Sequence, residues 1–196
     1  APWTLLIYML KAKESKNDIN YKIIREKELQ AKKILEKLHG YLCIHIKNQI
    51  EAGADVIQVF DSWAGLIEKD DLEKYCFNPN LKIVEFCKEN KIPVICFPKG
   101  INKHYKEFND IVKPHGINID YEVEPNWVKQ NLKNVVIQGG LDPKILLSNK
   151  RNILENAKKY LDIFQDLPYV FILGHGLLPE TDPDNVKKLI EFYREY

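Results

Sequence analysis

The sequence lacks the features that mark several large classes of protein. No apolar run approaches the ~18 residues of a membrane-spanning helix, so no membrane segment is predicted. The 29 Lys and Arg residues nearly balance 28 Asp and Glu residues, and a net charge of +1 argues against a nucleic-acid partner. Only four cysteines occur, without a CxxC pair or a secretory signal before them, which argues against a disulfide framework and a structural zinc site.

What is present is ordinary globular composition. The 196 residues are 45% hydrophobic and 29% charged, which predicts one domain with a core that needs no disulfides. A reduced, cytoplasmic protein is expected from the cysteine usage. The chain begins with Ala1 and not with Met, so a processed chain or a piece of something longer is expected.

Six short apolar runs predict the strands of a parallel sheet. Each is nearly continuous in apolar character, as strands buried on both faces are. The runs are residues 3–9, 55–60, 93–97, 117–121, 134–138 and 169–173. Amphipathic stretches between them predict helices around residues 35–50, 83–87, 105–112 and 153–164, and a last helix that Asp182 caps and Pro183 begins.

Six strand-helix units predict an α/β fold with right-handed crossovers. Two architectures fit, an open doubly wound sheet and part of a (β/α)8 barrel, which needs ~250 residues when complete. No GxGxxG or Walker loop follows a strand, so the nucleotide-binding open sheet loses its main support.

Candidate functional residues follow the strands, because parallel α/β folds gather their sites at the carboxyl ends of the strands. His175 lies between two glycines, where a ligand can approach the backbone closely. Ser62 follows Asp61 at the end of a strand and suits either a substrate carboxylate or a helix N-cap. Tyr8 suits either a ligand contact or the core.

Three further strand-end groups carry weaker signals. Asp120 is a candidate site carboxylate, and Lys99 is a weak candidate for an anion contact. Asp142 precedes Pro143 and is predicted to cap the start of a helix. Cys96 lies inside an apolar strand, where a thiol behaves as a small hydrophobe, and no GxSxG elbow is present.

Taken in order, several sequence segments resemble those of the uroporphyrinogen decarboxylase family. They are APWTL with the following YM, QIEAGADVIQVFDSWAG, PVICFPKG, IQGGLDP and LGHGLLPETDPDNV. The resemblance extends from Ala1 to the last helix, and the combination of FDSWAG, QGGLDP and LGHG makes it specific.

The resemblance implies a (β/α)8 TIM barrel that forms a homodimer with facing active-site clefts. It implies removal of four acetate carboxyl groups from uroporphyrinogen III to give coproporphyrinogen III in haem biosynthesis, with no cofactor and no metal. Tyr8, Ser62 and His175 then match substrate-binding residues, and Phe60 lines the cleft.

On this interpretation the six units are strands 3 to 8, and residues 1–196 form a single, partial barrel domain. The family's first two units carry an arginine-rich loop and an aspartate that binds the pyrrole nitrogens. No catalytic residue is therefore assigned within this chain. We expect the N-terminal half to come from a separate chain or from the rest of a longer protein.

The sequence also departs from the family. It has only three arginines, at positions 25, 151 and 194, and none follows a strand. Gly140 stands where the family has Asn, and the segment of Lys11 to Lys13 stands where it has glycines. Tyr121 also falls where an Asp-Trp pair is usual.

Two other interpretations compete with the decarboxylase. The related zinc-dependent methyltransferases carry a His-x-Cys where Phe97 to Lys99 stand and a second Cys where His175 stands, so a zinc thiolate site cannot be assembled here. The other is a truncated remnant without activity, whose exposed sheet edges invite aggregation.

Overall fold

The first apolar run, residues 3–9, is a helix and not the predicted strand. In the computed structural model, which describes residues 1–15 and 18–196, α1 extends over Pro2–Leu10. Its buried side chains recur at three- and four-residue spacing: Trp3, Leu6, Ile7 and Leu10. Pro2 suits the first turn of a helix because its missing N–H has no partner there. The exposed Tyr8 and Met9 are also large and apolar, so the run looks continuous and its helical period is hidden.

The other five predicted strands are present and form a parallel sheet, as expected of an α/β fold. They are β3 (Ile57–Asp61), β4 (Val94–Pro98), β5 (Gly116–Ile119), β6 (Val136–Gly139) and β7 (Tyr169–Val170). The strand order is β3-β4-β5-β6-β7. The described residues therefore hold five parallel strands and not the six predicted, because residues 3–9 form α1.

The chain divides into two compact units, residues 1–117 and residues 118–196. No helix among the described residues is long and apolar enough to cross a membrane. In the first unit, β3 pairs with β4 in register, with Ile57 opposite Val94, and Ile95 of β4 pairs with Gly116 of β5. Each unit has a core of its own.

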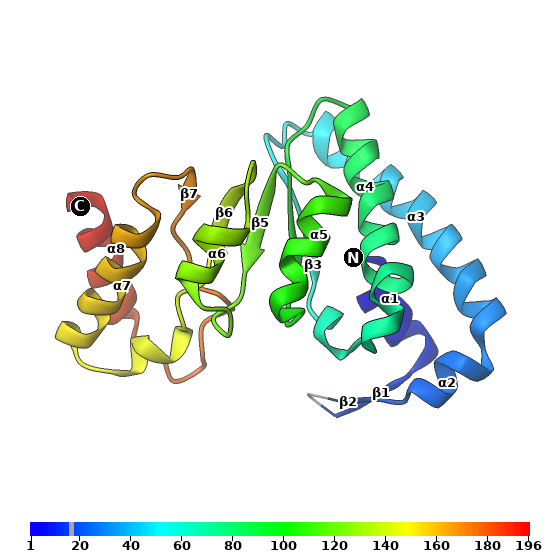
Figure 1. Cartoon of the computed structure of the whole chain (residues 1–196), viewed down its shortest axis with the longest axis horizontal. Coiled ribbons are helices and arrows are strands. Elements are labelled where there is room, and N and C mark those ends of the chain that lie inside the picture. The colour runs from blue at the N-terminus through cyan, green and yellow to red at the C-terminus, as the bar shows by residue number, and fades with distance from the viewer. Residues whose placement is uncertain (16–17) are drawn as a thin grey trace. The chain divides into compact units, whose positions relative to one another are not determined.

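Helices cover the strands of the first unit. They are α1, α2 (Tyr21–Glu26), α3 (Glu28–Glu51), α4 (Asn78–Glu89) and α5 (Tyr105–Val112), with short turns η1 (Ala64–Leu66), η2 (Lys69–Asp71), η3 (Glu73–Phe77) and η4 (Asn102–His104). A hairpin of β1 (Lys13–Ser15) and β2 (Asp18–Ile19) follows α1. Figure 1 shows α3 and α4 side by side. The end of α3 at Glu51 lies next to the predicted end at residue 50, and Gly53 follows with a φ of +95°.

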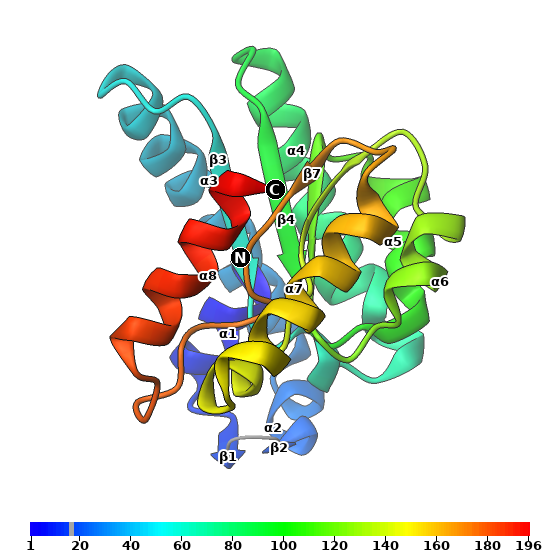
Figure 2. The ribbon, with the colours of Figure 1, turned by 90° about the vertical axis from the view of Figure 1, so that its left-hand side faces the viewer.

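The second unit begins within β5 and contains α6 (Pro125–Asn131), β6, η5 (Pro143–Leu147), α7 (Lys150–Phe164), β7 and α8 (Pro183–Glu195). Figure 2 shows α7 and α8 as successive helices of this unit, and the two pack against each other. Two of its helices, η5 and α8, start where the sequence predicts. Asp142 and Asp182 accept hydrogen bonds from the N–H groups of Lys144 and Asp184, each at 2.9 Å.

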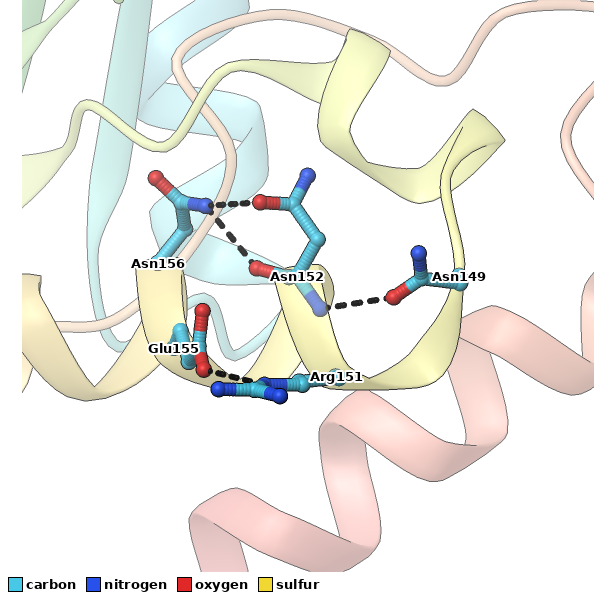
Figure 3. A network of polar contacts seen from close by, with 5 residues as sticks. All are labelled: Asn149, Arg151, Asn152, Glu155 and Asn156. Atoms are coloured by element: carbon cyan, nitrogen blue, oxygen red, sulfur yellow. Dashed lines mark hydrogen bonds and ion pairs between the residues drawn. The ribbon is translucent and has the colours of Figure 1, made fainter.

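The start of α7 is fixed by its own polar side chains (Figure 3). Asn149 is the N-cap and accepts a hydrogen bond from the backbone N–H of Asn152 at 3.0 Å. Asn156 then donates to Asn152, and Arg151 pairs with Glu155 at 2.7 Å. Because the first N–H groups of a helix lack intrahelical partners, this cap satisfies a donor that would otherwise depend on water.

Candidate active site

The end of β3 presents side chains on two faces, because successive residues of a strand point to opposite sides. Asp61 is fully buried, whereas Phe60 is 53% exposed and Ser62 is also exposed. Ser62 does not cap the next turn, since η1 follows Trp63 without a side-chain cap. The capping interpretation of Ser62 is therefore wrong, and its hydroxyl lies at the surface.

Asp61 ties together three elements of the first unit. Thr4 of α1 donates to its Oδ1 at 2.8 Å, and Asn80 of α4 donates to its Oδ2 at 3.3 Å. Burial raises the pKa of the Asp61 carboxyl, and these hydrogen bonds act in the opposite direction. The carboxyl therefore fixes α1, which carries Tyr8, relative to the strand that carries Phe60 and Ser62.

Tyr8 lies at the surface beside the end of β3. Its ring centroid is 4.4 Å from that of Trp63, and 59% of Tyr8 is exposed. The Nε1 of Trp3 donates to the carbonyl oxygen of Trp63 at 2.9 Å, which holds the segment after β3 against α1. The core interpretation of Tyr8 is wrong. Tyr8 and the residues around Ser62 are brought together by α1 packing on β3.

The segments after β3 and β4 touch through two glycines. The N–H of Gly65 donates to the carbonyl oxygen of Lys99 at 2.8 Å. A Cβ on Gly65 would lie 2.7 Å from the Cα of Gly100, closer than real Cβ contacts. Only glycine at position 65 allows this approach, which sets the half-buried Lys99 beside the Ser62 segment.

In the second unit, His175 follows β7 and is exposed. The N–H of Gly174 donates to the carbonyl oxygen of Leu141 at 2.8 Å, and the N–H of Gly176 donates to the Nδ1 of His175 at 2.6 Å. A ring nitrogen that accepts a hydrogen bond carries no proton, so this contact assigns the proton of a neutral His175 to Nε2. The imidazole can then donate a hydrogen bond through Nε2.

Polar side chains are also buried at the carboxyl ends of β5 and β6. Gln138 donates to the Oδ1 of Asn118 at 2.8 Å, and both are almost fully buried. Asp120 is 1% exposed and accepts a hydrogen bond from the N–H of Glu122 at 3.0 Å. The sequence interpretation missed the Asn118–Gln138 pair. Its only signal was an amide within each of two apolar runs.

Gly140, where the family resemblance places Asn, packs against α7. Its φ is +105°, and a Cβ there would lie 2.7 Å from the Cε1 of Tyr160. The hydroxyl of Tyr160 donates to the carbonyl oxygen of Gly140 at 2.6 Å. Burial raises the pKa of Tyr160 to about 12, so the phenol remains a donor at neutral pH. Tyr160 thus occupies the space into which a side chain at position 140 would extend.

The positions of the cysteines and of the other possible metal ligands do not favour a nucleophilic thiol or a metal site. Within residues 1–15 and 18–196, no three His, Cys, Asp or Glu side chains are grouped as a metal site requires. The four cysteines are free thiols, and burial raises the pKa of Cys96. Cys96 is fully buried and, as predicted, packs as a small apolar side chain.

The comparisons with known proteins decide the family. A family model described as uroporphyrinogen decarboxylase (URO-D) matches residues 1–196. The chain belongs to the uroporphyrinogen decarboxylase family. The sequence resemblance is confirmed, and the match includes both units of the fold.

Members of the uroporphyrinogen decarboxylase family from two bacterial genera are similar to the whole chain. The uroporphyrinogen decarboxylase of Rickettsia bellii (strain RML369-C) is 40% identical over 200 residues, covering 100% of this chain and 58% of its own length. That of Wolbachia pipientis wMel is 36% identical over 197 residues, covering 100% of this chain and 57% of its own length. The chain corresponds to the C-terminal part of these proteins.

Proposed function

We propose that this chain is the C-terminal part of a uroporphyrinogen decarboxylase, which converts uroporphyrinogen III to coproporphyrinogen III without a cofactor. The observation that carries the proposal is the family match over residues 1–196. Four exposed residues support it: Tyr8 of α1, which lies beside the end of β3, Phe60 and Ser62 at that end, and His175 after β7. Sites of this fold class lie at the carboxyl ends of the strands.

The reaction needs little covalent chemistry from the protein. A pyrrole ring protonated at carbon accepts the electron pair of the bond that joins the acetate methylene to its carboxylate. That bond breaks and carbon dioxide leaves. A proton added to the methylene carbon gives a methyl group, and loss of the proton first added to the ring carbon restores the pyrrole, so one proton is consumed for each carbon dioxide released. The protein then has to hold the carboxylates and stabilise the positive ring.

Each proposed substrate-binding residue suits part of that task. The phenol of Tyr8 and the hydroxyl of Ser62 are donors for acetate or propionate carboxylates. His175 supplies a further donor through Nε2–H. Phe60, with its ring 6.2 Å from that of Phe97, supplies an apolar surface for the macrocycle.

We further propose that an N-terminal polypeptide completes the barrel and supplies the cationic clamps and the carboxylate that the chain lacks. Large apolar side chains are exposed on α3 of the first unit: Leu29, Tyr41 and Ile44. In the second unit, a cavity of about 250 Å³ beside α8 is lined by apolar residues that include Phe171, Leu177 and Tyr193. Such surfaces are typical of contacts with further protein. A homodimer in the cytoplasm is part of the same proposal, and the free thiols suit that compartment.

The test is turnover of uroporphyrinogen III by this chain, alone and with the N-terminal polypeptide from the same source. We expect slow or absent turnover by the chain alone, because loss of a preorganised charged group costs ~10²–10³ in rate. Addition of the N-terminal polypeptide is expected to restore coproporphyrinogen production. No product with both parts present would refute the proposed activity and favour an inactive remnant.

A matched pair of histidine variants tests the site in the same assay. His175→Ala is expected to lower turnover and substrate affinity by roughly tenfold, for loss of a hydrogen bond worth ~1.4 kcal/mol. His45→Ala is the control, since His45 lies on α3 and contacts Gln49. Equal activities of the two variants would exclude His175 from the substrate site.

A further inference from the structure

A lysine covers the indole of Trp63 at the candidate site. The Nζ of Lys13 lies 4.1 Å from the centroid of the Trp63 ring, and that ring contacts Tyr8. A cation over an aromatic face is attracted by the electrons of the ring, so the ammonium has a preferred position. Lys13, Trp63 and Tyr8 therefore form one continuous group beside Ser62, the residue that precedes Trp63.

The residue before Lys13 is fixed by two backbone hydrogen bonds. The N–H of Ala12 donates to the carbonyl oxygen of Ile7 at 3.1 Å, and the carbonyl oxygen of Ala12 accepts from the N–H of Asn20 at 2.6 Å. Ala12 itself is fully buried. Lys13 thus follows directly after an anchored residue, and Lys13 itself is exposed.

Within the described residues no carboxylate pairs with Lys13, and its ammonium lies over the Trp63 ring. Some other lysines of the first unit are paired with acids. Lys106 lies 2.7 Å from Asp110 on α5, and Lys74 contacts Glu28 across two elements. Lys13 therefore presents a positive charge that is available to an external anion.

We propose that Lys13 binds a carboxylate of the tetrapyrrole substrate and acts together with the neutral donors Ser62 and Tyr8. This inference rests on the proposed function, which requires a ligand with many carboxylates and an apolar ring. The Lys13–Trp63–Tyr8 group presents a cation and aromatic rings side by side. An ammonium held in place before binding loses less freedom when it pairs with a carboxylate, which favours affinity.

A purely structural role makes different predictions from a binding role. If Lys13 only covers the indole, its charge contributes to the stability of the fold and not to the affinity for the ligand. Lys13→Gln removes the charge and keeps most of the side-chain length, whereas Lys13→Arg keeps both the charge and the stacking on Trp63. Lys106→Gln is the control, because it removes the same charge from α5.

The experiment is a titration of the chain with uroporphyrin, an octacarboxylate, followed by the quenching of tryptophan fluorescence. We expect Lys13→Gln to weaken binding by about fivefold, the equivalent of ~1 kcal/mol for one exposed ion pair. Lys13→Arg should bind within about twofold of the unaltered chain, and Lys106→Gln should leave affinity unchanged. The fall of affinity with salt should be shallower in Lys13→Gln, since one fewer charge is screened.

Different results would refute the role of Lys13 and the proposed function. Binding by the unaltered chain that is unchanged in Lys13→Gln refutes the role of Lys13 and leaves the proposed function standing. An equal loss of affinity in Lys106→Gln also refutes it, because net charge alone then explains the effect. No binding of uroporphyrin by the unaltered chain refutes the role of Lys13, whereas the proposed function fails only if the two polypeptides together give no coproporphyrinogen. Urea denaturation of each variant verifies that it is folded.

Discussion

Replacing Gly174, the residue before His175, by alanine is expected to strain the second unit. A Cβ at this position would lie 2.6 Å from the backbone nitrogen of Tyr121 and 3.0 Å from the carbonyl carbon of Asp120. Both are backbone atoms, so no change of rotamer relieves the contact. The two segments must separate by roughly 0.8 Å, the difference between 2.6 Å and the 3.4 Å at which ordinary contact begins.

Overpacking of this kind costs about 1–3 kcal/mol, so we expect Gly174→Ala to lower the free energy of unfolding by about 2 kcal/mol. Gly176, the residue after His175, is a matched control because a Cβ there meets no atom within 4 Å. Its φ is not positive, so Gly176→Ala is expected to be neutral or to stabilise by up to ~1 kcal/mol.

Urea denaturation followed by circular dichroism measures both alanine variants in the same way. Because the segment at Gly174 also sets the position of His175, uroporphyrin affinity should fall in Gly174→Ala and persist in Gly176→Ala. Equal stability and equal affinity of the two variants would show that the contact of Gly174 with residues 120 and 121 does not constrain the fold.

Three further changes test local features of the fold. Lys11→Gly should raise the free energy of unfolding by about 1 kcal/mol, because Lys11 ends α1 with a left-handed φ of 53° that glycine adopts freely; no gain in urea midpoint would contradict this. Asn149→Ala should lower the same free energy by about 1 kcal/mol through loss of the α7 cap, whereas Asn149→Gly should lose only a few tenths; equal losses would argue against a capping role. Burial raises the folded-state pKa of Asp61 above its unfolded value of 3.8, so the stability that this group contributes is present below about pH 4 and is lost as pH rises through the folded-state pKa. Unfolding free energies of Asp61→Asn measured from pH 3 to 7 should therefore fall less with rising pH than those of the unaltered chain, and parallel curves would contradict the assignment.

Most elements of this fold were predictable because their signals are local. A cap and a periodic apolar face lie within a few residues of one another, so Asp182 and Pro183 identify the start of α8 without knowledge of the rest of the chain. Short runs rich in Ile and Val likewise predicted the five parallel strands. The short helix α6 was missed, because residues 125–131 offer too few turns for a clear apolar face.

By itself the sequence determined the strand-helix alternation, the helix caps and, through the phrases around Ser62 and His175, the family. Only the tertiary structure decided that residues 3–9 are a helix, because a continuous apolar run fits either periodicity until one face is buried. It also decided the partners of Asp61, since Thr4 lies 57 residues away along the chain and Asn80 lies 19. The position of Lys13 over Trp63 likewise depends on a contact between segments that are distant along the chain. Contacts between distant segments depend on how helices pack on strands, and no local pattern of residue types records that packing.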